Sequence, residues 1–247
     1  MYGYENKLLI IKNYIINMLT LSMILIVIIL LIFVILVLPY NLQTDEKFLS
    51  ADDSYDLLRR DLDGYFKSLS ITELKKRNTD TINGYINSIN TLDFSEEQKY
   101  TLSRCINKAD KFFLTKFLTN KYGLEIENIP WKLALTQGNA YEFGYPHTRV
   151  DTIFISDNIF SKNKEDIVKI LIHEKIHLDQ KRNPEKYLKI ISIMGLTREQ
   201  HAENITRRAN PDIDKYVYYK DGSIYSNSEH PLEEIAYTID NMYESDK

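Results

Sequence analysis

The sequence predicts an α+β protein in which an N-terminal transmembrane helix precedes a mostly helical domain with a small sheet. Three observations lead to this prediction. A run of twenty residues near the N-terminus contains no charged residue. Most of the remaining chain shows apolar residues at the three- and four-residue spacing of a helix face. Two short runs of β-branched and aromatic residues, which are typical of strands, stand just before a central helical segment.

The composition excludes several other classes of protein. Apolar residues make up 44% and charged residues 27% of the chain, which argues against a disordered or collagen-like protein. The net charge of −4 indicates no concentrated basic face, so no nucleic-acid partner is expected. Cys105 is the only cysteine, which excludes an intrachain disulfide. Its place on an apolar helical stripe predicts a core residue rather than a nucleophile.

Residues 19–38 are the first predicted element, a transmembrane anchor. As a helix, this uncharged segment would span about 30 Å, the thickness of the hydrocarbon core of a bilayer. It is too long for the apolar region of a signal peptide, and no cleavage site follows it. Lysines prevail in the tail at 1–18 and acidic residues prevail after the span, which favours a cytoplasmic N-terminus and an exoplasmic C-terminal domain. The sequence therefore predicts a single-pass membrane protein whose residues 19–38 contact the lipid bilayer.

A linker at 39–51 and one domain at 52–247 are expected to follow the anchor. The first part of the domain, 52–125, is predicted to be helical, and two capping boxes, Ser70–Glu73 and Ser95–Gln98, mark helix starts within it. One apolar helical face is expected to comprise Leu57, Leu58, Leu62, Tyr65, Phe66 and Leu69.

The second part, 126–247, is predicted to mix strands and helices. The expected elements are strands at 131–135 and 152–156, helices at 164–182 and 184–194, strands at 215–219 and 223–225, and a last helix from Pro231. Gly195 stands where the second helix should end. Asp221-Gly222 between two strand-like runs predicts a tight hairpin turn.

The helix predicted at 164–182 carries the chemistry. His173 and His177 lie four residues apart, so they share one helix face and are close enough to bind one metal ion. Glu174 projects beside them, where its carboxylate can take a proton from a water molecule. In helical phase Lys175 falls on the far side from the histidines, so we expect it to be solvated. Burial of two histidines and a glutamate without partners is unfavourable, which favours a metal site over a purely structural group.

The segment His173-Glu174-Lys175-Ile176-His177 resembles the HExxH motif of the zincin metallopeptidases. Gln180 and Asn183 stand where the metzincin branch has glycine and histidine. The patterns of the aspzincins and deformylases are also absent, which leaves the gluzincins, whose third ligand is a glutamate of a downstream helix. The resemblance implies a zincin-like domain with a small sheet before the HExxH helix, one zinc ion, and a peptide or protein substrate.

The last helix offers two glutamates as the third ligand. Helical phase places Glu233 at the border of the apolar face and directs Glu234 toward water. The segment PLEEIA also resembles the Pro-x-Glu-x-x-Ala form of the third-ligand helix in some HExxH families. Glu233 is therefore the expected ligand, with His201 and Glu203 as alternatives. Asp240 shares the side of Glu233 and could orient a ligand histidine.

The implied function is a membrane-anchored zinc metallopeptidase in which Glu174 is the general base for a zinc-activated water. Candidates for oxyanion or substrate contacts are Tyr237, His230, Tyr216, Tyr218 and His147. For His147, a turn histidine without a function is the simpler interpretation. Two alternatives stay open. One is a catalytically inactive, zinc-binding, membrane-tethered interaction or assembly module, and the other is a structural helical membrane protein without metal.

A closer resemblance concerns the whole soluble part of the chain. It resembles uncharacterised membrane-anchored zincin-like proteins of large DNA viruses in Gly144–Thr148, in the HEKIH helix and in Asn210–Asp212. This resemblance implies a viral protein located in a viral or host membrane.

Overall fold

The chain divides into two units, residues 1–43 and residues 44–247. The structure, a computed structural model, describes residues 23, 25, 26, 46–117, 126–200, 216–225 and 230–244. All further statements concern these residues. The alternative ligands His201 and Glu203 and the segment Asn210–Asp212 lie outside them.

The predicted transmembrane helix at 19–38 requires a correction. Of this segment the structure describes Met23, Leu25 and Ile26, which are helical. No helix within the described residues is both long enough and apolar enough to cross a bilayer. The longest described helices, α6 (Glu96–Phe117) and α7 (Lys164–Arg182), have charged side chains along their length, and these are costly to place in hydrocarbon. The described residues therefore do not bear out the predictions of a membrane anchor and of a single-pass protein in a viral or host membrane, and apart from Met23, Leu25 and Ile26 the segment 19–38 lies outside them.

The second unit is an α+β fold. Its elements follow one another in the order β1 (Glu46–Phe48), α2 (Ala51–Arg60), α3 (Tyr65–Ser68), α4 (Ile71–Lys76), α5 (Ile82–Ser88), β2 (Thr91–Leu92), α6, η2 (Ile126–Asn128), β3 (Trp131–Thr136), η3 (Glu142–Gly144), β4 (His147–Arg149), β5 (Thr152–Ser156), η4 (Asp157–Ser161), α7, α8 (Pro184–Ile193), β6 (Thr197–Gln200), β7 (Tyr216–Lys220), β8 (Ser223–Ile224) and α9 (Pro231–Glu244). The strands predicted at 131–135 and 152–156 and the helix predicted at 164–182 are confirmed. β1 falls within the segment predicted as a linker.

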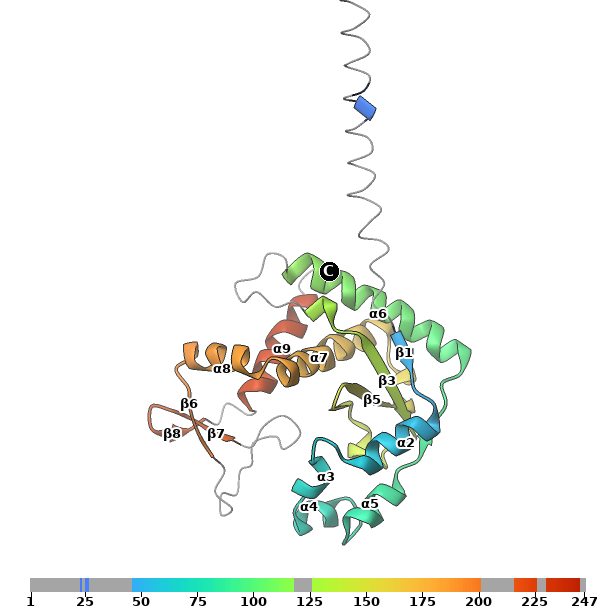
Figure 1. Cartoon of the computed structure of the whole chain (residues 1–247), viewed down its shortest axis with the longest axis vertical. Helices are drawn as coiled ribbons and strands as arrows, with labels where there is room; N and C mark the ends of the chain where they lie inside the picture. Colours follow the sequence, from blue (N-terminus) through green and yellow to red (C-terminus); the bar gives the residue numbers. More distant parts are fainter. Residues whose placement is uncertain are drawn as a thin grey trace, which may run out of the picture. The chain divides into compact units, whose positions relative to one another are not determined.

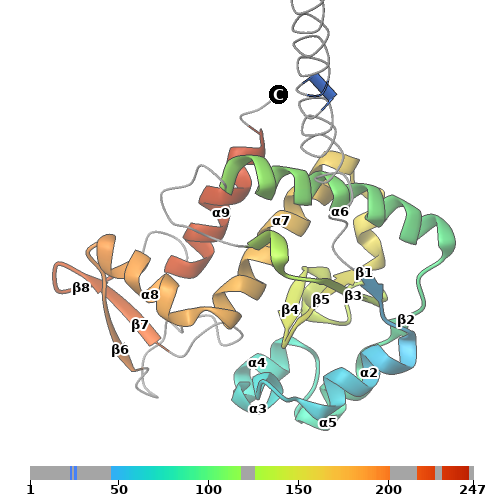
Figure 2. The ribbon, with the colours of Figure 1, turned by 45° about the horizontal axis from the view of Figure 1, so that its top comes forward.

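A five-stranded mixed sheet separates two hydrophobic cores. Its order is β1-β3-β5-β4, with β2 paired to β3. β1 and β5 run parallel to β3, whereas β2 and β4 are antiparallel to their neighbours. Leu133 and Ile153 face the core formed with α6–α9, while Ala134 and Phe154 face the core formed with α2–α5. Figures 1 and 2 show these two groups of helices on opposite sides of the sheet, with β4 at its edge near α7.

Local capping and turn signals are confirmed where the sequence predicted them. Both capping boxes form, since Ser70 and Glu73 bond reciprocally, as do Ser95 and Gln98. β7 and β8 join in a hairpin whose turn residues Asp221 and Gly222 have φ of 51° and 77°. Cys105 is buried, and burial raises the pKa of its thiol above the ordinary value.

The helical face predicted from Leu57 to Leu69 is interrupted between α2 and α3. Asp61 and Gly64 adopt left-handed φ of 44° and 69°, so Leu62 is 60% exposed. Asp61 accepts hydrogen bonds from the backbone at the start of α3 and, like Asp63, pairs with the fully buried guanidinium of Arg149. The break between α2 and α3 therefore places two carboxylates beside the buried guanidinium of Arg149 in β4. The apolar periodicity of residues 57–69 could not indicate this ion pair.

Lys175 is fully buried, so the prediction that it is solvated is wrong. Its ammonium group lies 2.8 Å from an Asp110 carboxylate oxygen and 4.1 Å from the centre of the Trp131 ring. The indole N–H of Trp131 donates to the same oxygen. Because α6 and β3 cover the face of α7 that points away from the histidines, this helix is buried on both sides.

Candidate metal centre

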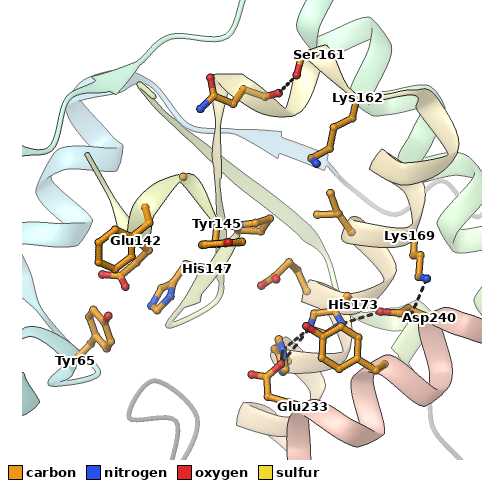
Figure 3. A pocket seen from close by; sticks show the side chains of 18 of the residues that line it. Tyr65, Glu142, Tyr145, His147, Ser161, Lys162, Lys169, His173, Glu233 and Asp240 are labelled. Carbon is orange, nitrogen blue, oxygen red and sulfur yellow. Dashed lines mark hydrogen bonds and ion pairs between the residues drawn. The ribbon is translucent and has the colours of Figure 1, made fainter. Parts of the chain in front are cut away.

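Three potential ligand atoms converge where α7 packs against α9 (Figure 3). The Nε2 atoms of His173 and His177 are 3.0 Å apart. A carboxylate oxygen of Glu233 lies 3.3 Å from each of them. His173, Glu174 and His177 form a group that can hold a metal ion, since their ligand atoms lie within 4.8 Å of one another.

The other nitrogen of each histidine has an oxygen partner that fixes the tautomer. The Nδ1 atom of His173 lies 2.8 Å from a carboxylate oxygen of Asp240. The Nδ1 atom of His177 lies 2.8 Å from the amide oxygen of Gln180, whose amide nitrogen donates to the carbonyl of Leu232 at 2.9 Å. Because both partners of Nδ1 are acceptors, a neutral imidazole at either position carries its hydrogen on Nδ1 and directs the Nε2 lone pair toward the centre.

The electrostatics of the cluster favour a positive charge at its centre. Burial lowers the pKa of His173, but hydrogen bonds to Asp240 and Glu233 outweigh it and raise that pKa to about 10. The pKa of His177 is also raised, since its hydrogen bond to Glu233 outweighs burial. Burial opposes ionisation of Glu233, yet the two histidines hold its pKa far below the ordinary value. In the absence of a metal these pKa shifts favour protonated histidines paired with Glu233, and a bound metal cation would take the place of the Nε2 protons.

A residue of the sheet fixes the side chain of Glu174. Its side chain is 5% exposed, and one carboxylate oxygen accepts a hydrogen bond of 2.7 Å from the hydroxyl of Thr148 in β4. β4 is therefore fixed to α7 directly beside the histidine cluster. No signal in the sequence indicated Thr148, because it stands 26 positions before its partner and on another element.

A pocket of about 700 Å³ opens onto the candidate metal centre and extends toward α3 and α4. Two of the candidate contact residues, Tyr237 and His147, line it. The ring of Tyr237 packs on that of His173, with 4.7 Å between centroids. Figure 3 shows His147 on the opposite side of the pocket from His173.

The other candidates are not brought to this pocket. His230 instead accepts a hydrogen bond from the backbone N–H of Leu232 at the start of α9, and its ring packs edge-on against Tyr218. Tyr216 and Tyr218 lie on β7 and are not among the lining residues. Glu234, which helical phase directs toward water, is half-buried and accepts a hydrogen bond from the hydroxyl of Tyr225, so that expectation is corrected.

Gln180 contacts the candidate ligand His177, although it was not among the site residues predicted from the sequence. It stands three residues after His177, so helical spacing could have marked it as a partner of that histidine. Its second bond, to α9, depends on how the two helices pack and has no sequence signal. Comparison of the chain with known protein families, with curated proteins and with solved structures gives no match.

Proposed function

We propose that this protein is a zinc-dependent peptidase of the gluzincin type, in which His173, His177 and Glu233 bind one zinc ion. The convergence of three ligand atoms at 3.0–3.3 Å from one another carries the proposal. Ligands about 2.0–2.1 Å from a tetrahedral zinc ion lie about 3.3 Å apart, so the three atoms fit the edges of such a site. Three protein ligands leave a fourth position open, which is typical of catalytic rather than structural zinc.

Glu174 is the proposed general base. A zinc ion supplies a Lewis acid that lowers the pKa of a water molecule and polarises the carbonyl of the scissile bond. Glu174 would accept the proton of the attacking water and pass it to the leaving amine. The hydroxyl of Thr148 holds one carboxylate oxygen of Glu174, which restricts its orientation. Tyr237, 44% exposed beside His173, is a candidate donor to the developing oxyanion.

An extended peptide is the substrate that best fits the surroundings. β4 is the terminal strand in the order of the described sheet, and its residue Thr148 contacts Glu174. An extended chain can add through backbone hydrogen bonds to the part of such an edge that is open, since the carbonyl of Thr148 already accepts a hydrogen bond from Lys181. The pocket beside it has the size of sites that enclose several side chains or a small ligand.

Metal analysis combined with an activity assay tests the proposed function. We expect the purified protein to contain about one equivalent of zinc, to cleave a mixture of internally quenched peptides, and to lose this activity with a chelator and regain it with zinc. A protein that binds no metal would contradict the proposal. Zinc binding without cleavage of any peptide would favour the catalytically inactive zinc-binding module instead.

Gln180 offers a test of the metal centre that does not depend on turnover. Gln180→Met keeps the length of the side chain but removes both the acceptor for His177 and the donor to Leu232. We expect zinc affinity, measured by competition with a chromophoric chelator, to fall about 10–100-fold. Gln180→Glu retains the acceptor and should bind zinc more tightly than Gln180→Met. Equal zinc affinity in all three proteins would show that Gln180 does not orient His177.

A further inference from the structure

The half of the pocket away from the histidines is lined by exposed aromatic side chains. Phe143 in η3 and Tyr145 just after η3 belong to the loop 141–146, and they are 48% and 73% exposed. Tyr237 lines the same pocket from α9, on the side of His173. Of the four exposed aromatic residues in the described part of the chain, these three line this pocket and the fourth, Tyr100, does not. Exposed apolar surface gathered in one concave place marks a binding site better than scattered residues do.

The backbone of this loop adopts an unfavourable conformation. Glu142, Phe143 and Gly144 have successive φ of 43°, 58° and 81°. Residues with a Cβ atom disfavour this left-handed region, and such conformations gather at functional sites. Glycine is favoured at 144, because a residue with a Cβ atom is strained at this φ and its Cβ would lie 2.5 Å from the Asn139 side-chain oxygen.

Buried hydrogen bonds compensate the energetic cost of this conformation. The carboxylate of Glu142 accepts hydrogen bonds of 2.6 Å from the hydroxyl of Tyr85 and from the guanidinium of Arg77. The same hydroxyl accepts the backbone N–H of Glu142 at 3.0 Å. Arg77 also lies 5.3 Å from the centre of the Phe143 ring. The base of the loop is thus tied to α5 and to the end of α4, and Phe143 projects from a rigid support.

The charged side chains that η3 and the α4 region contribute to the pocket are paired within the protein. Arg77 and Glu142 form an ion pair, and the carboxylate of Glu73 accepts two hydrogen bonds from Ser70 in its capping box. A charged ligand group would have to give up water and compete with these pairs. An aromatic or large aliphatic group would instead gain from burial against the exposed rings.

We propose that the loop 141–146 forms a subsite for an aromatic or large apolar side chain of a peptide. The inference rests on the proposed peptidase function and names the substrate class for that site. The loop continues directly into β4, so a peptide lying along β4 passes both the loop and Glu174. Side chains of an extended peptide point alternately to opposite sides, and one of them can enter the subsite.

A binding experiment tests the subsite without turnover. Zinc-loaded Glu174→Gln protein is titrated into fluorescent, alanine-rich hexapeptides that differ at one position, which is Phe, Leu, Ala, Lys or Glu. We expect the best Phe peptide to bind at least about 10-fold more tightly than its Ala, Lys and Glu counterparts. The double variant Phe143→Ala with Tyr145→Ala should reduce this preference to about 3-fold or less. Tyr100→Ala is the matched control and should leave it unchanged.

A second variant tests the strained backbone itself. Gly144→Ala leaves both aromatic rings in the chain but opposes the left-handed conformation of the loop. We expect it to bind zinc normally and to lose the preference for Phe. Normal circular dichroism together with normal zinc content would establish that the variant is folded.

The possible failures are distinguishable. Equal binding of the Phe and Ala peptides by zinc-loaded protein would overturn the subsite and leave the proposed function standing. A preference for Phe in a protein whose wild type cleaves no peptide would overturn the proposed function and keep the subsite. If the double variant changes the sedimentation of the protein but not its peptide affinity, the aromatic residues form a contact between copies of the chain, and the inference is wrong.

Discussion

Glu174→Gln is expected to abolish most hydrolysis while zinc content stays near one equivalent. The amide keeps the shape of the side chain and an oxygen that can accept the hydrogen bond from Thr148, but it cannot take a proton from water. Loss of a positioned general base lowers a rate by about 10²–10⁴-fold. Steady-state kinetics with a quenched peptide, together with zinc analysis of the same sample, measure both quantities.

The control for this variant is Glu185→Gln. Glu185 is an exposed glutamate in the first turn of α8, so the same change of charge occurs outside the pocket. Its kinetics should match those of the wild type. A Glu174→Gln protein that cleaves as fast as the wild type would disprove the catalytic role. A Glu174→Gln protein that no longer binds zinc would instead show that Glu174 is itself a ligand.

Glu233→Gln is expected to weaken zinc binding more than 100-fold, which exceeds the effect typical of losing a partner that only orients a ligand. The change replaces a carboxylate, 3.3 Å from both histidine Nε2 atoms, with a neutral amide. At a free zinc concentration 1,000 times the wild-type Kd, zinc stabilises the folded protein by about 4.1 kcal/mol. A 100-fold loss of affinity would reduce this to about 1.4 kcal/mol. Urea denaturation with and without zinc measures the difference.

Glu234→Gln is the matched control on the neighbouring residue. Its amide oxygen can still accept the hydrogen bond from Tyr225, so we expect a stability change within about 0.5 kcal/mol and unchanged zinc affinity. Equal zinc affinity of the Glu233→Gln and Glu234→Gln proteins would exclude Glu233 as a ligand. A loss of zinc binding in Glu234→Gln alone would identify Glu234 as the ligand.

Arg149 links the candidate metal centre to α3 and the turn before it. It follows Thr148 in β4 and is fully buried between the carboxylates of Asp61 and Asp63, and the rings of Tyr65 and Phe66 lie within 4.7 Å of its guanidinium carbon. Its interactions fix the edge strand against α3. The partner of Glu174 is therefore positioned by residues more than 80 positions earlier in the chain.

Local signals in the sequence predicted the elements that carry the site. The helix predicted at 164–182 coincides with α7, and the glycine and aspartate of the hairpin turn adopt the left-handed conformations that their types permit. The four-residue spacing of His173 and His177 follows from helix geometry alone. The phase of α9 distinguished Glu233 from Glu234 because the apolar residues of that helix define its buried face.

The sequence by itself therefore determined which helix carries the histidines and which glutamate of α9 faces them. Only the tertiary structure decided what covers each helix and which distant groups meet, as for Lys175 with Asp110, Thr148 with Glu174, and the loop at 142–144 with Arg77. The physical reason is that periodicity reports the environment of a residue relative to its own helix or strand. The identity of a partner depends on how separate elements pack, and buried polar groups then select the arrangement that satisfies them.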